Sequence, residues 1–474
     1  MQPAIKFGTD GWRGIIADDF TFSNVRYCAQ SVADHLCDRG LASQGLVIGY
    51  DTRFASEDFA AVAAEVIAAN NIRVYLCTQA TPTPVVSYAT INQKAAGAII
   101  ITASHNPAQW NGFKIKTADG ASAPTDVEAD IESRLPQIIT QDRVKVLPLR
   151  DGLDKGLIEY LNPVPVYDKH IAQLVDLDNL RRAGLNIVVD SMFGAGTGYF
   201  KKLLQGSRTE VTEINGERNP IFPGIQPEPI ARHLSKLATL VGTSKSDVGL
   251  ATDGDADRIG VVDETGNPLT PLQIFALLAL YLLEVRGERG PIVKTLTTSS
   301  MLYKLGDIYN VPVYETRVGF KYVAPKMITY NALIGGEESS GFGFRGHLPE
   351  RDGILAGLYF LDLMHKLKRT PSQLIDYLYS KVGPHHYQRV DLEFPPTDRE
   401  RIIGRLANRT PSRIADTEVL KINTIDGFHF SLADGSWLLI RLSGTEPILR
   451  IYAEASSLER AKTLVAQGRD ILGV

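Results

Sequence analysis

One local pattern recurs three times in the chain and constrains its fold more than any other feature. A short apolar run ends in a polar turn in the segments 44–53 (QGLVIGYDTR), 185–192 (LNIVVDSM) and 290–299 (GPIVKTLTTS). Each run follows a glycine-containing turn and precedes a helix-like stretch, such as SEDFAAVAAEVIAA at 56–69. Buried β-runs that alternate with helices are typical of α/β domains with largely parallel sheets. We therefore predict an α/β protein with repeated domains.

The C-terminal part of the chain has a different pattern. Polar and apolar residues alternate at 389–394, 427–432 and 437–442, and a turn at Asp434-Gly435 joins the last two segments like a hairpin. Segment 456–459 (SSLE) then opens a final helix with a capping-box pattern. We predict a smaller α+β domain from about residue 382 onward.

Bulk properties exclude several classes of protein. Acidic residues outnumber basic ones by 54 to 50, which argues against a general nucleic-acid binder. Three cysteines without a CxxC motif are typical of a reduced intracellular protein without a cysteine metal site. The N-terminal segment lacks an apolar signal core, and the longest apolar run, 274–283, is too short to span a bilayer. We expect a cytoplasmic enzyme with no nucleic-acid or membrane partner.

Three aspartates alternate in the segment 253–258 (DGDADR), between two apolar strands. Carboxylates at every second position can converge on a hard divalent cation such as Mg²⁺, which prefers oxygen ligands. A calcium EF-hand is rejected because Arg258 stands where that loop needs glycine, and because the flanks are strands rather than helices. A solvated acidic turn is the alternative. We predict a Mg²⁺ site formed by Asp253, Asp255 and Asp257.

Two further loops carry groups suited to a phosphorylated sugar. Segment 441–447 (RLSGTEP) combines an arginine, two hydroxyls and a glycine, which are the parts of a phosphate cradle. A plain hairpin loop is its alternative. Segment 336–342 (GEESSGF) offers carboxylates and hydroxyls that can bond vicinal sugar hydroxyls, and His347 and Arg351 follow it. The alternative there is an ordinary acidic loop.

Segment 100–115 (IITASHNPAQWNGFKI) places Ser104 beside His105 after a buried strand. A hydrolase is not favoured, because adjacent residues of an extended segment point to opposite faces and no GxSxG elbow occurs in the chain. No phosphate-binding P-loop motif occurs either. The remaining chemical use of Ser104 is to carry a phosphoryl group, whose charge near −2 requires cations around it. Asn106-Pro107 would shape the turn that presents it.

Taken together, five motifs in this order resemble those of the α-D-phosphohexomutase family, which includes phosphoglucomutase and phosphomannomutase. They are FGTDGWRG at 7–14, TASHNP at 102–107, DGDADR at 253–258, GEESSG at 336–341 and RLSGTEP at 441–447. The resemblance implies four domains around a central cleft, namely three similar α/β domains with mixed sheets and a smaller C-terminal α+β domain. We place them at 1–160 (phosphoserine loop), 161–264 (metal loop), 265–381 (sugar-binding loop) and 382–474 (phosphate binding).

The resemblance also implies roles for individual residues. Ser104 would be the phosphoserine and would share the metal with the three aspartates. Lys114, Arg258 and His105 would complete the catalytic set. Lys114 would handle a proton through a pKa lowered by other cations, or would simply compensate phosphate charge. His105 would orient the loop. The expected substrate-binding residues are Arg13, Glu337, Ser339, His347, Arg351, Arg441, Ser443, Gly444 and Thr445.

The sugar loop indicates the substrate. Its layout, with a downstream histidine and a basic-Asp-Gly sequence, resembles family members that prefer glucose. Mannose-tolerant members tend to differ at the position of Glu338, where glucosamine-specific members tend to carry Gln. We expect interconversion of glucose 1-phosphate and glucose 6-phosphate, with Mg²⁺ as cofactor and glucose 1,6-bisphosphate as intermediate and activator.

Three alternatives remain at this point. They are a synthase that releases glucose 1,6-bisphosphate, a phosphomannomutase, and a non-catalytic sugar-phosphate sensor. A sensor would be expected to lack Ser104 or a metal aspartate, and this chain has them all. The expected partners are small sugar phosphates, and the expected assembly is a monomer or a small homo-oligomer.

Overall fold

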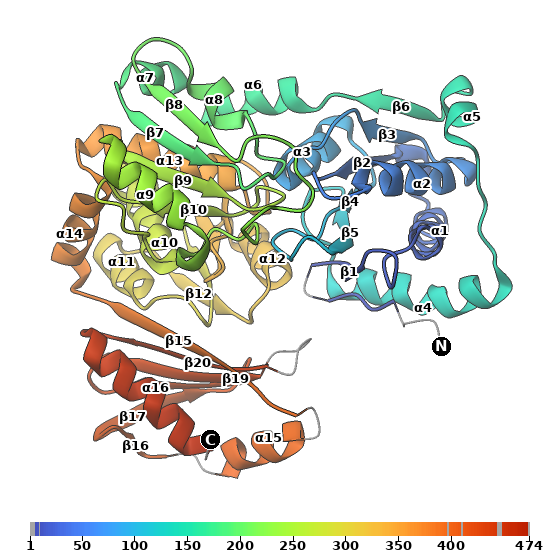
Figure 1. Cartoon of the computed structure of the whole chain (residues 1–474). Coiled ribbons are helices and arrows are strands. Elements are labelled where there is room, and N and C mark those ends of the chain that lie inside the picture. The colour runs from blue at the N-terminus through green and yellow to red at the C-terminus, as the bar shows by residue number, and fades with distance from the viewer. Residues whose placement is uncertain (1–4, 9, 396–397, 409–410, 443–447, 473–474) are drawn as a thin grey trace.

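The structure is a computed structural model that describes residues 5–8, 10–395, 398–408, 411–442 and 448–472. Four β-sheets follow one another along the chain (Figure 1). The first three sheets are mixed and belong to α/β domains, whereas the fourth is antiparallel. We number the domains I to IV in chain order. The predicted fold class is confirmed, and the predicted domain boundaries stay predictions.

Domain I has a six-stranded sheet in the order β1-β5-β4-β2-β3-β6. Strands β4, β2, β3 and β6 are parallel, and β5 and β1 pair antiparallel at one side. Because β2 and β4 are parallel neighbours, the loops that follow them leave the same edge of the sheet. Its elements are β1 (Trp12–Ile15), α1 (Phe22–Asp38), the 3-10 helix η1 (Ala42–Gln44), β2 (Leu46–Tyr50), α2 (Ser56–Ala69), β3 (Val74–Cys77), α3 (Thr83–Gln93), β4 (Gly97–Ile101), β5 (Trp110–Thr117), α4 (Thr125–Gln141), α5 (Leu149–Asp154) and β6 (Ile158–Leu161).

Domain II has a four-stranded sheet in the order β10-β9-β7-β8, in which only β10 runs antiparallel to its neighbour. The predicted metal loop connects β9 to β10. The elements are α6 (Val164–Leu174), α7 (Leu177–Arg182), β7 (Asn186–Asp190), α8 (Tyr199–Leu204), β8 (Glu210–Ile214), the 3-10 helix η2 (Ala231–His233), α9 (Ser235–Ser244), β9 (Val248–Thr252) and β10 (Ile259–Val262).

Domain III repeats this arrangement with the order β12-β11-β13-β14, and the predicted sugar loop joins the antiparallel pair β13 and β14. Its elements are α10 (Pro271–Leu280), the π-helical turn η3 (Tyr281–Val285), β11 (Ile292–Thr295), α11 (Met301–Tyr309), β12 (Val313–Thr316), α12 (Phe320–Tyr330), β13 (Ile334–Gly336), β14 (Phe342–Phe344), α13 (Gly353–Leu367) and α14 (Pro371–Val382).

Domains II and III share one hydrophobic core. The apolar run 274–283 lies in that core within α10 and η3, and every residue of it is buried. Gly357 of α13 packs against the ring of Phe200 in α8, and α13 also contacts β9 and β10, so this helix of domain III covers part of the sheet of domain II. Among the described residues, no helix is both long and apolar enough to cross a membrane.

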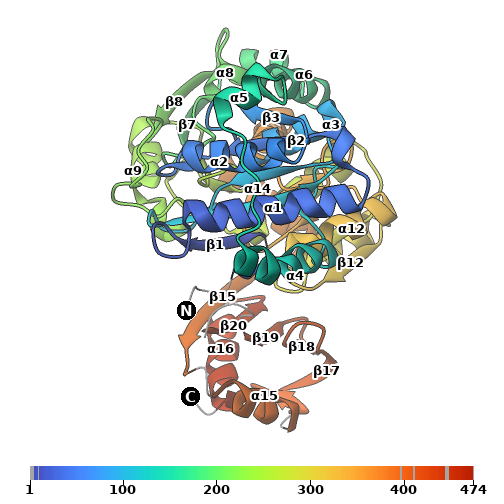
Figure 2. The same cartoon turned by 90° about the vertical axis from the view of Figure 1, so that its right-hand side faces the viewer.

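Domain IV has a six-stranded antiparallel sheet in the order β15-β20-β19-β18-β17-β16, with its own core. Both views show it at one end of the molecule, below domain III, where β15 leads into it (Figures 1 and 2). Helix α16 begins one residue later than the capping-box pattern predicts, because the hydroxyl of Ser457 caps the backbone N–H of Arg460. The elements are β15 (His386–Glu393), α15 (Arg399–Asn408), β16 (Arg413–Ile414), β17 (Thr417–Asn423), β18 (Phe428–Leu432), β19 (Trp437–Leu442), β20 (Ile448–Ala455) and α16 (Leu458–Leu472).

Candidate active site

The loop after β4 meets the loop between β9 and β10, so the serine and metal motifs of two domains lie side by side. The hydroxyl of Ser104 donates to Asp253 Oδ2 at 2.8 Å, and both side chains are buried. The close approach of the two loops requires a glycine at position 254, because a Cβ there would lie 2.3 Å from the carbonyl oxygen of Ser104. The metal loop is also fixed to domain I, where the backbone N–H of Thr83 donates to the carbonyl of Asp255 at 2.9 Å.

His105 lies closer to Ser104 than the sequence predicts. Its Nδ1 is 3.4 Å from Ser104 Oγ. The expectation of opposite faces is wrong because Ser104 adopts a left-handed backbone conformation with φ of +54°, which ends the alternation of an extended strand. Burial, reinforced by the charges of Arg258 and Arg13, holds the pKa of His105 well below its ordinary value. The imidazole is therefore neutral beside the serine.

The three aspartates converge as predicted. One carboxylate oxygen of each lies within 4.8 Å of the others, and all three side chains are buried. Asp255 Oδ1 and Asp257 Oδ1 have no hydrogen-bond partner among the described residues. Burial, then repulsion from Asp257 and Asp255, raises the pKa of Asp253 well above its ordinary value. Buried, mutually repelling carboxylates with unused oxygens form a donor set that fits a hard divalent cation.

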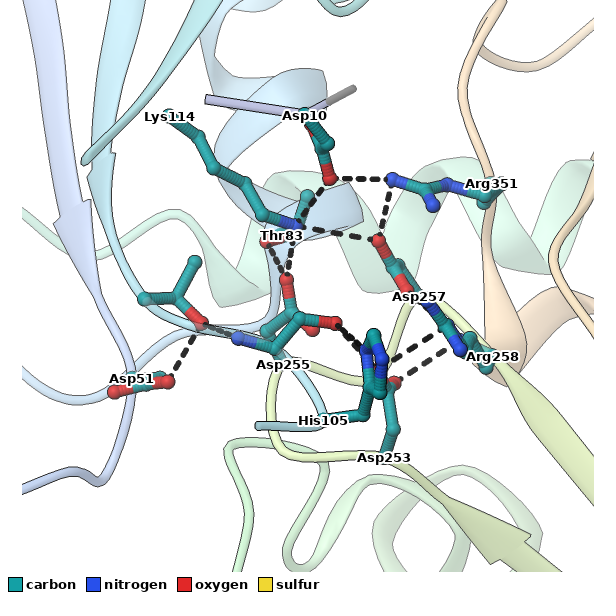
Figure 3. A network of polar contacts seen from close by, with 12 residues as sticks. Asp10, Asp51, Thr83, His105, Lys114, Asp253, Asp255, Asp257, Arg258 and Arg351 are labelled. Atoms are coloured by element: carbon teal, nitrogen blue, oxygen red, sulfur yellow. Dashed lines mark hydrogen bonds and ion pairs between the residues drawn. The ribbon is translucent and has the colours of Figure 1, made fainter. Parts of the chain in front are cut away.

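Lys114 lies at the centre of an acidic network (Figure 3). Its Nζ is 2.7 Å from Asp10, 2.8 Å from Asp255 and 3.4 Å from Asp257. Burial favours the neutral amine, but these three carboxylates outweigh it and raise the pKa of Lys114. The predicted lowering of this pKa is wrong, because the nearest groups are anions rather than cations. Lys114 is protonated here, which fits charge compensation.

Arg351, expected at the substrate, joins the same network from domain III. Its Nη2 is 2.7 Å from Asp10 and 2.8 Å from Asp257, and its Nε is 3.1 Å from Glu350. Burial opposes its charge, but Asp257, Asp10 and Glu350 raise the pKa of Arg351 well above the ordinary value. The guanidinium thereby joins domain III to Asp10 of domain I and to the metal loop of domain II.

The remaining predicted cations flank Ser104. Arg258 is 7% exposed, and its Nε lies 3.8 Å from both Asp253 and Asp257 without a hydrogen bond among the described residues. Arg13, on β1, donates from Nη1 to the side-chain oxygen of Asn106 in the serine loop. Both guanidinium groups therefore lie where an additional anion would be attracted.

The sugar loop presents its two glutamates in different directions. Glu337 Oε1 accepts from the backbone N–H of Gly319 at 3.0 Å, and its Oε2 is 3.6 Å from Arg351. Glu337 therefore faces the acidic network around Lys114. Burial raises the pKa of Glu337. Glu338 instead contacts domain IV, through Tyr387 at 3.0 Å and Arg389 at 3.2 Å. Ser339 is half-buried between β13 and β14. The role of Glu337 and Ser339 in sugar binding stays a prediction.

His347 lies in a partly buried cluster of its own. Its Nε2 is 2.8 Å from Asp352, and its Nδ1 is 3.0 Å from His170 of α6. Tyr167 also donates to Asp352 at 2.7 Å, and Tyr88 of α3 stacks on His170. Both ring nitrogens of His347 thus have protein partners from domains II and III. Contact of His347 with substrate stays a prediction.

The phosphate loop predicted in domain IV is described only in part. Arg441, at the end of β19, pairs with Asp426 at 3.0 Å, and Asp426 also accepts from the backbone N–H of Val318 in domain III at 2.9 Å. Ser443, Gly444 and Thr445 lie outside the described residues. Binding of a substrate phosphate by this loop stays a prediction.

Sequence reasoning missed several residues of the site. Asp10 lies in the first motif, but nothing in the sequence connects it to Lys114. Burial alone would raise the pKa of Asp10, but Lys114, Lys116 and Arg351 hold it well below the ordinary range. Thr83 follows an unremarkable stretch and donates to Asp255 Oδ2 at 2.6 Å. Only the three-dimensional meeting of domains I, II and III identifies these contacts.

Three mixed α/β domains, an antiparallel fourth domain and a serine facing an aspartate triad together define an enzyme of the phosphohexomutase class. Family models for phosphoglucomutase/phosphomannomutase match all four domains. The α/β/α domains I, II and III match at residues 4–142, 165–266 and 270–382, and the C-terminal domain matches at 403–471. The chain belongs to the phosphoglucomutase/phosphomannomutase family, that is, the α-D-phosphohexomutases.

Similar proteins cover the whole length of the chain. A phosphoglucomutase/phosphomannomutase of Thermococcus kodakarensis is 31% identical over 98% of both chains. A probable phosphoglucosamine mutase of Methanothermobacter thermautotrophicus is 31% identical over 98% of this chain and 97% of its own length. A crystal structure of a putative phosphomannomutase from Thermus thermophilus covers both chains fully with a TM-score of 0.86 and 33% identity.

Proposed function

We propose that this phosphohexomutase interconverts glucose 1-phosphate and glucose 6-phosphate through a phosphoserine at Ser104 and a glucose 1,6-bisphosphate intermediate. The observation that carries the proposal is the 2.8 Å contact of Ser104 with Asp253, inside a buried group of three carboxylates. The donor set fits Mg²⁺, which Asp253, Asp255 and Asp257 would hold together with the phosphoserine. When bound, the ion would act as a Lewis acid on the phosphate oxygens.

In the first transfer, the bond between phosphorus and Ser104 Oγ breaks and a bond to O6 of glucose 1-phosphate forms. The proton of the O6 hydroxyl leaves, and Ser104 regains a hydroxyl. His105, whose Nδ1 is 3.4 Å from Ser104 Oγ, is placed to hold or move a proton at this atom. Arg258 and protonated Lys114 compensate the charge of the transferring group. Such transfer depends mainly on alignment and charge neutralisation.

The bisphosphate then turns within the site, and the phosphoryl group at C1 returns to Ser104. The bond between phosphorus and O1 breaks, the bond to Oγ forms again, and glucose 6-phosphate remains. Glu337 would hold sugar hydroxyls, because its carboxylate faces the catalytic network. Arg441 would hold the phosphate that does not react.

Two measurements test this function. Mass spectrometry of protein treated with glucose 1,6-bisphosphate should find one phosphate on Ser104. The variant Ser104→Ala should lack both the phosphate and the turnover. Near-normal turnover of Ser104→Ala would overturn the carrier role. Product analysis with a second sugar bisphosphate supplied as phosphoryl donor separates a mutase from a bisphosphate synthase, because only a synthase that this donor rephosphorylates accumulates free glucose 1,6-bisphosphate.

A second candidate substrate is glucosamine phosphate. It is favoured by relatives named probable phosphoglucosamine mutase at 31% identity, including one from Methanosphaera stadtmanae. Comparison of kcat/KM for glucose 1-phosphate, glucosamine 1-phosphate and mannose 1-phosphate decides between the three sugars. A higher value for either competitor would reject the glucose preference.

A further inference from the structure

Arg53 occupies the centre of the serine loop, although the proposed reaction does not use it. It ends the first of the three recurring strand-and-turn segments, and its side chain is fully buried. Its Nη2 donates to the carbonyls of Ser104 at 2.7 Å and Asn106 at 2.6 Å. Its Nη1 donates to the carbonyls of Pro107 at 2.9 Å and Trp110 at 3.0 Å. One guanidinium thus binds four carbonyls of the loop that carries the serine.

Asp51 extends this arrangement to the backbone N–H of the serine itself. Asp51 Oδ2 lies 3.2 Å from Arg53 Nε and accepts from the hydroxyl of Thr102 at 2.6 Å. The same hydroxyl accepts from the backbone N–H of Ser104 at 2.8 Å. Both sides of the Ser104 backbone, the N–H and the carbonyl, are therefore tied to the pair of Asp51 and Arg53 at the end of β2.

Domain II holds the loop from the opposite side. The ring of Phe222 lies 5.0 Å from the guanidinium carbon of Arg53. The amide of Gln226 donates to the carbonyl of His105 at 2.9 Å, which is the carbonyl between two that Arg53 binds. The loop that presents Ser104 to Asp253 is thus fixed where domains I and II meet.

The planar shape of arginine matters for this arrangement. A guanidinium offers five donors in a rigid fork, whereas a lysine ammonium is a compact point charge that cannot reach four diverging carbonyls in the same way. Buried carbonyls that lose their donors must find others, and a loop that shifts to do so displaces Ser104. The shape of the Arg53 guanidinium therefore contributes more than its charge to holding the serine loop in place.

From this geometry we infer that Arg53 is a positioning residue for phosphoryl transfer, which sets Ser104 Oγ against Asp253 without touching the substrate. The inference rests on the proposed function, since it concerns the transfer step at Ser104. A displacement of about 1 Å in a reacting group can cost about 100-fold in rate. Loss of the fork should therefore lower kcat and leave the binding of sugar phosphate nearly unchanged.

The test compares Arg53→Lys with the control Arg134→Lys. Arg134 of α4 pairs with Asp130 on the same helix and with Asp38 at the end of α1, so the control makes the same chemical change outside the site. We expect kcat of Arg53→Lys to fall by about 10- to 100-fold, with KM for glucose 1-phosphate within about threefold of native. The rate at which Ser104 takes phosphate from glucose 1,6-bisphosphate, followed by quenching and mass spectrometry, should fall by the same factor. The control should match the native protein in all three.

If Arg53 had only a structural role, Arg53→Lys would lower the melting temperature, but it would not lower kcat while leaving KM nearly unchanged. Native kcat in a folded Arg53→Lys variant, or a rise in KM equal to the fall in kcat, would overturn the inference. If Arg53→Lys does not fold, Asp51→Asn carries the same test, because it removes the charge that orients Arg53. Native kcat in Asp51→Asn would then overturn it. Absence of phosphate on Ser104 in the native protein would instead reject the proposed function.

Discussion

Ser104 Oγ lies 2.8 Å from Asp253 Oδ2, although 149 residues separate them in the chain. The contact joins domains I and II at the edges of two different sheets. It places a hydroxyl, the group that would carry a phosphoryl, directly on Asp253, whose pKa is raised well above its ordinary value by burial and by repulsion from its neighbouring aspartates. Metal binding and phosphate transfer would therefore occur at one point and depend on the same inter-domain fit.

Gly254→Ala tests how close this fit is. A Cβ at Gly254 would meet the carbonyl oxygen of Ser104 at 2.3 Å, and because Gly254 and this oxygen both belong to the backbone, the loops must move apart. We expect kcat to fall by about 100-fold and the free energy of unfolding to fall by about 1–3 kcal/mol. The matched control is Gly404→Ala on α15, where a Cβ meets no atom within 4 Å. It should keep native kcat. Native kcat in Gly254→Ala would contradict the loop contact.

Removal of one metal ligand should abolish stabilisation by Mg²⁺. A ligand that binds only the folded state at about 100 times its Kd stabilises that state by about 2.7 kcal/mol. Thermal melts in chelator and in increasing Mg²⁺ should show this for the native protein and not for Asp255→Asn. The control Asp307→Asn changes an exposed aspartate of α11 and should respond like the native protein. An equal Mg²⁺ response in Asp255→Asn would reject the metal assignment.

Lys114 should contribute through its charge rather than by titrating. Three carboxylates raise its pKa, so it stays protonated across the neutral range. Lys114→Met leaves Asp10, Asp255 and Asp257 without their shared cation, and loss of one partner from such a buried group costs about 3–5 kcal/mol. Lys114→Arg keeps a charge that does not titrate. We therefore expect kcat/KM to have the same pH dependence in the native protein and in Lys114→Arg. An alkaline limb present only in the native protein would show that Lys114 titrates.

Local patterns in the sequence predict much of this fold, because each pattern follows from which residues of a single segment are buried. The helix at 56–69 begins and ends at the predicted residues, and the apolar run 274–283 lies in a core, as its composition requires. The aspartate triad is predictable for the same reason, since two-residue spacing in one short loop allows the carboxylates to converge.

Contacts between distant segments could not be predicted in the same way. The pKa of Lys114 depends on Asp10, which is far away in sequence but 2.7 Å away in space. The upward direction of the pKa shift follows from that neighbour. The position of His105 depends on a single left-handed residue, Ser104, which pattern rules treat as extended. Arg53 has no motif of its own, and only the path of the serine loop around it shows its role.

Glu338 should couple the sugar loop to domain IV. Its carboxylate accepts from Tyr387 and Arg389 on β15, so it holds the domain that carries Arg441. A partly exposed ion pair contributes about 1 kcal/mol, which corresponds to about a fivefold change in binding. We expect Glu338→Gln to raise KM for glucose 1-phosphate by about three- to fivefold, with kcat within about twofold of native. The control Glu418→Gln alters an exposed residue of β17. Unchanged KM in Glu338→Gln would reject the coupling.

Acid should destabilise domain IV through His429, whose ring stacks on Trp437 with centroids 5.1 Å apart. Burial lowers the pKa of His429 to about 4, although Glu315 partly offsets this. An unfolded histidine takes up its proton near pH 6.5, so below that pH unfolding binds a proton that the folded state does not. His429 therefore costs no stability above about pH 7, and its cost grows as the pH falls from about 6.5 to about 4. Between pH 7.5 and pH 5, this group should lower the free energy of unfolding by about 2 kcal/mol.

Urea unfolding of the native protein and of His429→Gln, followed by tryptophan fluorescence at both pH values, measures the effect. The native protein should lose about 2 kcal/mol more than the variant, and equal losses would show that His429 does not titrate in this range.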